Sequence, residues 1–149
     1  MKEMLISDII EKLITYNRRM YEYGKNVRHY GTDQELRIDQ IHIIDYIGRH
    51  PGCRLGSIAA DTDTYLPTIS LQVKRLIKLG LISKKRSEQD QREIILNLTD
   101  EGNTIFNHHS EMDYQWSSSF SELLSAFGHE ELTSIDLFLK TLLENKPTI

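Results

Sequence analysis

The apolar positions in residues 66–80 follow the repeat of a helix with one buried face. Apolar residues recur there at spacings of three or four positions, ending in an adjacent pair: Leu66, Ile69, Val73, Leu76 and Ile77. At about 100° per residue they share one side of the helix. The opposite side carries three cations, and its members are Pro67, Leu71, Lys74, Arg75 and Lys78, flanked by Thr68, Ser70 and Gln72. Because cations bind phosphate and short polar groups reach base edges, this division predicts a helix that reads the major groove of DNA.

Two shorter helices and a turn precede this reading helix. The first is predicted over Ile38–Arg49 and ends at His50-Pro51-Gly52, because the residue before a proline is disfavoured in the helical region. The second is predicted over Leu55–Asp61, and Asp63-Thr64-Tyr65 forms the turn before the reading helix. Pro67 is tolerated there because it falls in the first helical turn. Two helices joined by a tight turn, the second with a polar outer face, predict a helix-turn-helix.

A β-hairpin is predicted directly after the reading helix. Gly80 stands where a C-cap glycine is expected, and residues 81–86 and 93–98 alternate like two strands. A hairpin that follows a helix-turn-helix is the pattern of a winged helix. We expect the cations of this wing to contact the DNA backbone or minor groove, the alternative being a solvated hairpin tip. They are Lys84, Lys85, Arg86 and Arg92.

Longer apolar helices are predicted on both sides of this central part. They cover about residues 7–30, with Ser7 as N-cap, about residues 99–120, capped by Thr99, and about residues 130–143. The last of them is apolar over too wide an arc for a solitary surface helix, so we expect it to form a dimer interface with the first. The predicted fold class is therefore mainly α with a small β-hairpin wing. A winged helix-turn-helix DNA-binding domain at 36–98 is flanked by a dimerisation helix at 1–35 and dimerisation helices at 99–149.

The distribution of charge changes what the acidic composition implies. The 149 residues carry a formal net charge of −4, which taken alone argues against a polyanionic partner. Residues 51–92, however, hold eight Lys or Arg against four Asp or Glu, whereas residues 93–149 hold two against ten. The positive segment contains the reading helix and the wing, so the cations gather where nucleic acid is expected to bind.

The sequence disfavours several classes of protein. No apolar run approaches the roughly 18 residues of a membrane span, and the N-terminus lacks the cleavage site of a signal peptide. Cys53 is the only cysteine, which excludes an intrachain disulfide and favours a cytoplasmic location. No Gly-rich phosphate loop, G-x-S-x-G or H-E-x-x-H motif occurs, so we predict no enzyme activity and no cofactor.

Six short sequence motifs occur in a fixed order along the chain. They are Leu55-x-x-Ile58-Ala59, Pro67-Thr68-Ile69-Ser70, Val73-x-Arg75-Leu76, Leu76-x-x-x-Gly80-Leu81-Ile82, Asp90-x-Arg92 and Leu98-Thr99-x-x-Gly102. Together with the order of elements, they resemble the MarR family of bacterial transcription regulators. The resemblance covers nearly the whole chain and implies a homodimer that binds a pseudopalindromic operator in double-stranded DNA.

The resemblance also implies roles for single residues. It places five residues of the reading helix against DNA: Thr68, Ser70, Leu71, Gln72 and Arg75. It makes Arg92 the wing contact, oriented by Asp90. Position 71 is often basic in relatives and is Leu here, so the base preference of the family does not carry over. An exposed leucine could be an ordinary surface residue or could contact a thymine methyl group.

A regulator of this kind is expected to respond to a signal, which the sequence leaves open. The favoured hypothesis is a repressor relieved by a small aromatic or amphipathic effector that binds between the dimerisation helices and the DNA-binding part. An effector that fits only one spacing of these parts weakens DNA binding by its differential affinity. The candidate pocket residues are Tyr16, Tyr23, His42 and Tyr46.

Zinc sensing is an alternative within the same resemblance. His42 and His108 fall where the zinc-sensing branch of the family has histidine. The rest of that pattern does not match, because Glu, Glu and His are expected where the chain has Ile41, Asn107 and Met112. Otherwise His42 is a core or pocket histidine, and His108 and His109 are surface residues.

Two other hypotheses concern a different signal and a different partner. Cys53 lies beside Arg54 and could sense oxidants if its thiolate were stabilised. The winged helix could instead assemble with protein subunits and bind no DNA.

Overall fold

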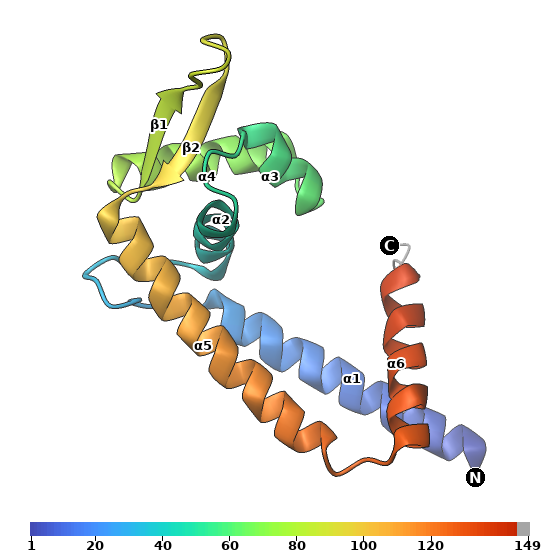
Figure 1. The fold of residues 1–149 in the computed structure, drawn as a ribbon. Helices are drawn as coiled ribbons and strands as arrows, with labels where there is room; N and C mark the ends of the chain where they lie inside the picture. The colour runs from blue at the N-terminus through green and yellow to red at the C-terminus, as the bar shows by residue number, and fades with distance from the viewer. Residues whose placement is uncertain (146–149) are drawn as a thin grey trace. The chain divides into compact units, whose positions relative to one another are not determined.

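The computed structural model describes residues 1–145, which form six helices and a two-stranded antiparallel sheet (Figure 1). In chain order these elements are α1 (Lys2–Lys25), α2 (Ile38–Arg49), α3 (Leu55–Asp61), α4 (Leu66–Lys78), β1 (Ile82–Arg86), β2 (Ile94–Leu98), α5 (Asp100–Leu124) and α6 (His129–Glu144). The mainly helical class with a hairpin wing is confirmed. The chain divides into two compact units, residues 1–110 and 111–149. The three functional parts predicted at 1–35, 36–98 and 99–149 stay a prediction.

The core of the first unit is built around α2. Helix α2 packs against α3, α4 and β2, and it buries Ile41, Ile43, Ile44 and Ile47. Each aliphatic side chain that is fully buried contributes about 1.5–3 kcal/mol relative to an exposed one. Because α2 is covered on several sides, it fixes the positions of α3, α4 and the hairpin.

Helices α3 and α4 pack together across a tight turn, as the predicted helix-turn-helix requires. Asp63 occupies this turn with φ of 49°, a left-handed conformation that aspartate tolerates better than most residues. The expected buried face of α4 is confirmed at Ile69, Val73 and Leu76. It is wrong at Leu66, which is 46 % exposed, and Ile77 is half-buried.

The end of α4, the start of β1 and the start of α5 meet at one junction. Gly80 has φ of +77°, and the N–H of Leu81 donates to the carbonyl of Leu76 at 3.0 Å, which is the Schellman ending expected of a C-cap glycine. The hydroxyl of Thr99 donates to the carbonyl of Gly80 at 2.6 Å and accepts the N–H of Gly102 at 3.1 Å. A Cβ at Gly102 would lie 2.1 Å from the carbonyl oxygen of Leu81. The predicted cap at Thr99 therefore also connects α5 to α4.

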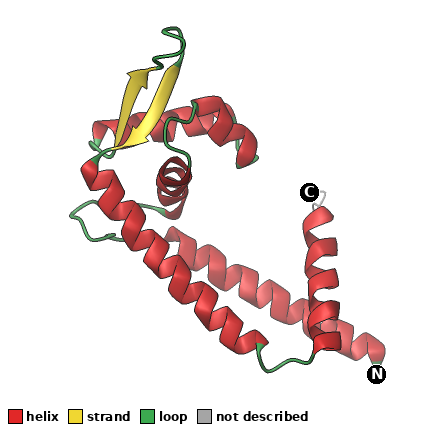
Figure 2. Cartoon of the chain, viewed as in Figure 1, coloured by secondary structure: helices red, strands yellow, loops and turns green. Residues whose placement is uncertain are grey.

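The two strands of the predicted hairpin pair antiparallel. Cα partners across the two strands include Ile82 with Leu98, Lys84 with Leu96 and Arg86 with Ile94. Figure 2 shows the two strands in yellow and the loop that joins them at the tip. The N–H of Leu96 also donates to the carbonyl of Cys53 at 2.9 Å, which ties the loop before α3 to the outer side of β2.

Helix α1 begins and ends earlier than predicted. Ser7 lies inside the helix instead of capping it, because the residues before it are compatible with a helix and extend it to Lys2. The helix ends at Lys25, directly after Gly24, and Arg28 then pairs with Leu36 in an isolated β-bridge. The segment predicted to be helical up to residue 30 is thus held by a sheet-like contact.

Helices α1 and α6 bury none of their described residues. The exposed large apolar residues of α1 are Met4, Leu5, Ile6, Ile9, Ile10, Ile14, Tyr16 and Tyr21. Those of α6 are Leu137, Phe138, Leu139, Leu142 and Leu143. Each helix therefore presents an apolar face that its own unit does not cover. No helix among residues 1–145 is both long enough and apolar enough to span a membrane.

Candidate nucleic-acid interface

The outer side of α4 is exposed along its whole length. The exposed residues among those predicted to contact DNA are Pro67, Thr68, Leu71, Lys74 and Arg75, and Ser70 is half-buried. Within the described part of the chain, Lys74, Arg75 and Lys78 form no ion pair with a carboxylate. Three uncompensated cations on one exposed helix face give it a positive potential, which attracts phosphate.

Gln72 lies on the inner flank of α4, where it contacts α2. Its side-chain N–H donates to a carboxylate oxygen of Asp39 at 3.1 Å, and its own oxygen is buried. Asp39 also pairs with the Arg37 guanidinium at 3.2 Å. The role of Gln72 in DNA contact stays a prediction, but the structure gives its amide a partner within the chain.

The wing carries the second group of cations. Lys84, Lys85 and Arg86 are exposed on β1, and an Arg86 N–H donates to the carbonyl of Gln91 at 2.5 Å. Arg92 is exposed in the loop. At the same end of the wing, Glu93 forms an ion pair with Arg54 at 2.5 Å, and this pair connects the wing to the residue that precedes α3.

Asp90 acts on the backbone of Arg92. The carboxylate of Asp90 accepts the backbone N–H of Arg92 at 2.9 Å, and no ion pair between the two side chains occurs among the described residues. Asp90 therefore shapes the turn that presents Arg92, and the proposed orientation of the guanidinium by Asp90 stays a prediction.

Tyr65 is an exposed residue of this surface that the sequence analysis left out. It is the N-cap of α4, its side chain makes no capping hydrogen bond, and it is 75 % exposed. A signal was present in the sequence, because Ser, Thr, Asp or Asn is preferred at an N-cap and this chain has tyrosine there. A large aromatic side chain at this exposed position offers an apolar ring and a hydroxyl to a partner.

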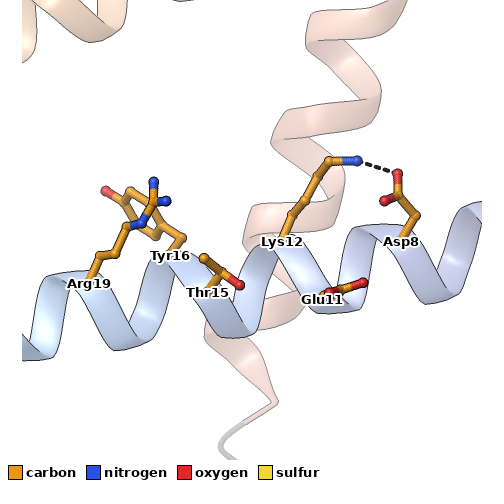
Figure 3. A pocket seen from close by; sticks show the side chains of 6 residues that line it. All are labelled: Asp8, Glu11, Lys12, Thr15, Tyr16 and Arg19. Atoms are coloured by element: carbon orange, nitrogen blue, oxygen red, sulfur yellow. Dashed lines mark hydrogen bonds and ion pairs between the residues drawn. The ribbon is translucent and has the colours of Figure 1, made fainter.

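The four residues predicted to line an effector pocket have different surroundings. Tyr16 lines a surface depression along α1, together with Asp8, Glu11, Lys12, Thr15 and Arg19 (Figure 3). The guanidinium carbon of Arg28 lies 3.6 Å from the ring centroid of Tyr23. His42 lies exposed on α2. No described pocket is lined by all four, so a shared effector site stays a prediction.

Tyr46 connects α2 to α3. Its hydroxyl donates to the carboxylate of Asp61 at 2.5 Å, and its ring centroid is 4.5 Å from that of His50. The hydrogen bond to Asp61 raises the pKa of Tyr46 to about 12, since losing the phenolic proton would place two anions together. These contacts make Tyr46 a link between helices.

The histidines are arranged differently from the expectation. His109 was expected at the surface but is buried, and its ring lies edge-on to that of Tyr30 with the centroids 5.8 Å apart. His42 was expected in a core or pocket but is exposed, 6.4 Å from His109 between ring centroids. His108 is exposed and lies against Gly31, where a Cβ would come 2.2 Å from its Nε2. Zinc binding by His42 and His108 stays a prediction.

Cys53 is half-buried in the loop before α3. Burial raises the pKa of its thiol above the ordinary value. An oxidant sensor needs the opposite shift, because the thiolate is the reactive form. The surroundings of Cys53 therefore do not favour the oxidant-sensing hypothesis.

Comparisons with known proteins agree with this arrangement. Residues 29–109 match the model of a family described as "Transcriptional regulator SarA/Rot". The HTH-type transcriptional regulator BilQ of Clostridium symbiosum is 28% identical over 111 residues, which cover 74% of this chain and 75% of BilQ. FabT of Streptococcus pneumoniae, solved in complex with DNA, is 25% identical with a TM-score of 0.74, over 93% of this chain and 95% of FabT.

The fold is shared more widely still. ZitR of Lactococcus lactis, described as a zinc-responsive MarR family member, has been solved in complex with DNA. That complex has a TM-score of 0.78 at 21% identity, over 93% of this chain and 95% of ZitR. The predicted resemblance to the MarR family is confirmed.

Proposed function

Because the chain belongs to the SarA/Rot family of transcriptional regulators, we propose that it binds a short pseudopalindromic operator as a homodimer and represses transcription until an effector releases it. In this proposal α4 enters the major groove and the wing reaches the adjacent backbone or minor groove. The winged helix, which is shared with FabT and ZitR, supports this geometry.

The observation that carries the proposal is the set of unpaired cations on α4 and the wing of an acidic chain. Lys74, Arg75 and Lys78 are exposed on α4, and Lys84 and Lys85 are exposed on β1. The chain as a whole has a net charge of −4, so a uniform distribution would leave this surface negative. Cations without partners on the two elements that meet DNA in a winged helix support binding to a polyanion.

The apolar faces of α1 and α6 support a homodimer. Exposed apolar side chains run along both helices, and large exposed apolar patches of this kind mark sites of protein–protein interaction. A two-fold symmetric dimer covers each face with its counterpart. It also presents two copies of α4 to half-sites about one helical turn apart, roughly 34 Å.

The depression along α1 supports a small-molecule signal. Figure 3 shows the side chains of Lys12, Tyr16 and Arg19 rising from the same side of this helix. Lys12 is paired with Asp8 in this depression, so the tyrosine ring beside the Arg19 guanidinium suits a small amphipathic or aromatic molecule. An effector that binds only one arrangement of the dimer lowers DNA affinity by the ratio of its affinities for the two arrangements.

Selection of bound duplexes from random DNA tests the core of this proposal. We expect the wild-type chain to enrich a two-fold symmetric sequence and to sediment as a dimer. Replacement of Lys74 and Lys78 by Ala should abolish enrichment. The matched variant that replaces Lys2 and Lys140 by Ala has the same net charge and should enrich the same sequence. A wild-type chain that enriches no duplex would instead support a protein-interaction module.

A further inference from the structure

Leu71 is the side chain of α4 that points most directly away from the core. The buried positions Ile69 and Val73 define the inner side of the helix, and at about 100° per residue Leu71 lies almost opposite to them. Its side chain is 51 % exposed. Pro67, one turn earlier, is exposed as well, so the leading half of the outer line of α4 is apolar and offers no hydrogen-bond donor.

The charged neighbours of Leu71 indicate which kind of partner this apolar line contacts. Lys74 and Arg75 follow it within one turn, and neither forms an ion pair among residues 1–145. An apolar protein partner would have to leave these cations desolvated and unpaired, which is costly. A duplex satisfies both groups, because phosphates take the cations while the outer line of the helix lies in the groove.

In the major groove, a single kind of base pair offers an apolar group at its edge. Thymine carries a 5-methyl group there, whereas the edges of the other bases present hydrogen-bond donors and acceptors. The side chain of leucine has neither a donor nor an acceptor, so it gains nothing from those edges. Burying it against the amino group of a cytosine also removes water from that group without replacing the hydrogen bond.

We propose that Leu71 determines specificity by packing on the 5-methyl group of a thymine at one position in each half-site. The inference rests on the proposed DNA-binding function and adds to it the group that is read. A preference for thymine could also arise from hydrogen bonds to the edge of the base pair. In this proposal the methyl group alone causes the preference.

Removal of single methyl groups tests this inference directly. In the selected duplex, each thymine is replaced in turn by deoxyuridine in both half-sites, and the Kd is measured by fluorescence anisotropy at fixed salt. One buried methyl group corresponds to about fourfold in affinity, so we expect about 15-fold weaker binding at the contacted position when both half-sites change. In Leu71→Ala this difference between thymine and uracil should vanish.

Adding a methyl group to cytosine provides the complementary test, in which affinity should be regained. Where the contacted thymine is replaced by cytosine, wild-type affinity should fall, and 5-methylcytosine at that position should restore part of it. Leu79→Ala is the matched control, because Leu79 is also an exposed leucine of α4, 39 % exposed at its C-cap, and it should keep the wild-type preference for the methyl group. Leu71→Ala should keep the wild-type salt dependence, which shows that its phosphate contacts are intact.

The outcomes separate this inference from the function on which it rests. If the chain selects a duplex but no thymine shows a penalty on demethylation, or the penalty persists in Leu71→Ala, the inference is overturned and DNA binding stands. If the chain selects no duplex at all, the proposed function and this inference fail together.

Discussion

Arg75→Ala tests whether the unpaired cations of α4 meet phosphate. Arg75 is exposed, so the substitution leaves the core intact, and the guanidinium forms no ion pair with any residue from 1 to 145 that its loss would disturb. In a two-fold symmetric complex, each protomer contributes one such contact. The variant dimer therefore loses two phosphate contacts at once.

The expected magnitude follows from counterion release. Each phosphate contact adds about −0.9 to the slope of log K against log salt concentration, so two lost contacts make the slope shallower by about 1.8. If the contribution is taken as zero near 1 M salt, the variant binds about 200-fold more weakly at ~0.05 M and about 30-fold more weakly at ~0.15 M. At ~0.5 M the same calculation gives a loss of affinity of only about 3.5-fold.

The assay is fluorescence anisotropy with a labelled duplex over a potassium chloride series. Lys140→Ala is the charge-matched control, because Lys140 is exposed on α6 and should leave the slope unchanged. Arg75→Lys retains the charge and should keep the wild-type slope, with a loss of affinity that is the same at every salt concentration. An Arg75→Ala slope equal to that of wild type would refute the phosphate contact, whatever the loss of affinity at one salt concentration.

Other substitutions test single contacts. Gln72→Ala should destabilise the fold by about 1–2 kcal/mol in urea denaturation, because it leaves the carboxylate of Asp39 without its amide donor. If this variant selects the same DNA sequence as the wild type, Gln72 stabilises the fold and does not read a base. Gly102→Ala should lower the free energy of unfolding by about 1–3 kcal/mol, because the added methyl group overpacks the junction. Gly56→Ala is the control, because a Cβ there meets no atom within 4 Å, and it should leave the stability unchanged or raise it. Equal effects of the two substitutions would contradict the packing argument. The pKa of Tyr46 is raised to about 12, so the hydrogen bond to Asp61 contributes fully to the stability of the fold below pH 10, and this contribution is lost as the pH rises through 12. Tyr46→Phe should remove the last tyrosinate absorbance to appear in a pH titration.

Local signals were sufficient for the central elements. Pro51 ends α2 and Gly80 ends α4, and both act through backbone restrictions that do not depend on the rest of the fold. The two strands of the hairpin follow from the alternation of side chains before and after a polar loop. Signals of this kind are short in range, so a sequence displays them directly.

Features that depend on distant partners could not be predicted in the same way. Whether His42 or His109 is buried depends on which face of α5 meets Tyr30, and no periodicity in either helix encodes that choice. The amide of Gln72 points to Asp39, 33 positions earlier in the chain, although Gln72 also suits a base contact. Ser7 shows the converse limit, because a capping residue inside a segment of good helix formers need not cap anything.

The hydroxyl of Thr99 has a mechanical consequence for regulation. It joins Gly80, the residue after the C-cap of α4, to Gly102 in the first turn of α5, and the absence of a Cβ at Gly102 lets α5 pack directly against the backbone of Leu81. A tilt of the first turn of α5 should therefore move α4 and the hairpin together. For the proposed DNA complex, we therefore expect dissociation to be concerted, with α4 and the hairpin leaving together and no long-lived intermediate that stays attached by the hairpin alone.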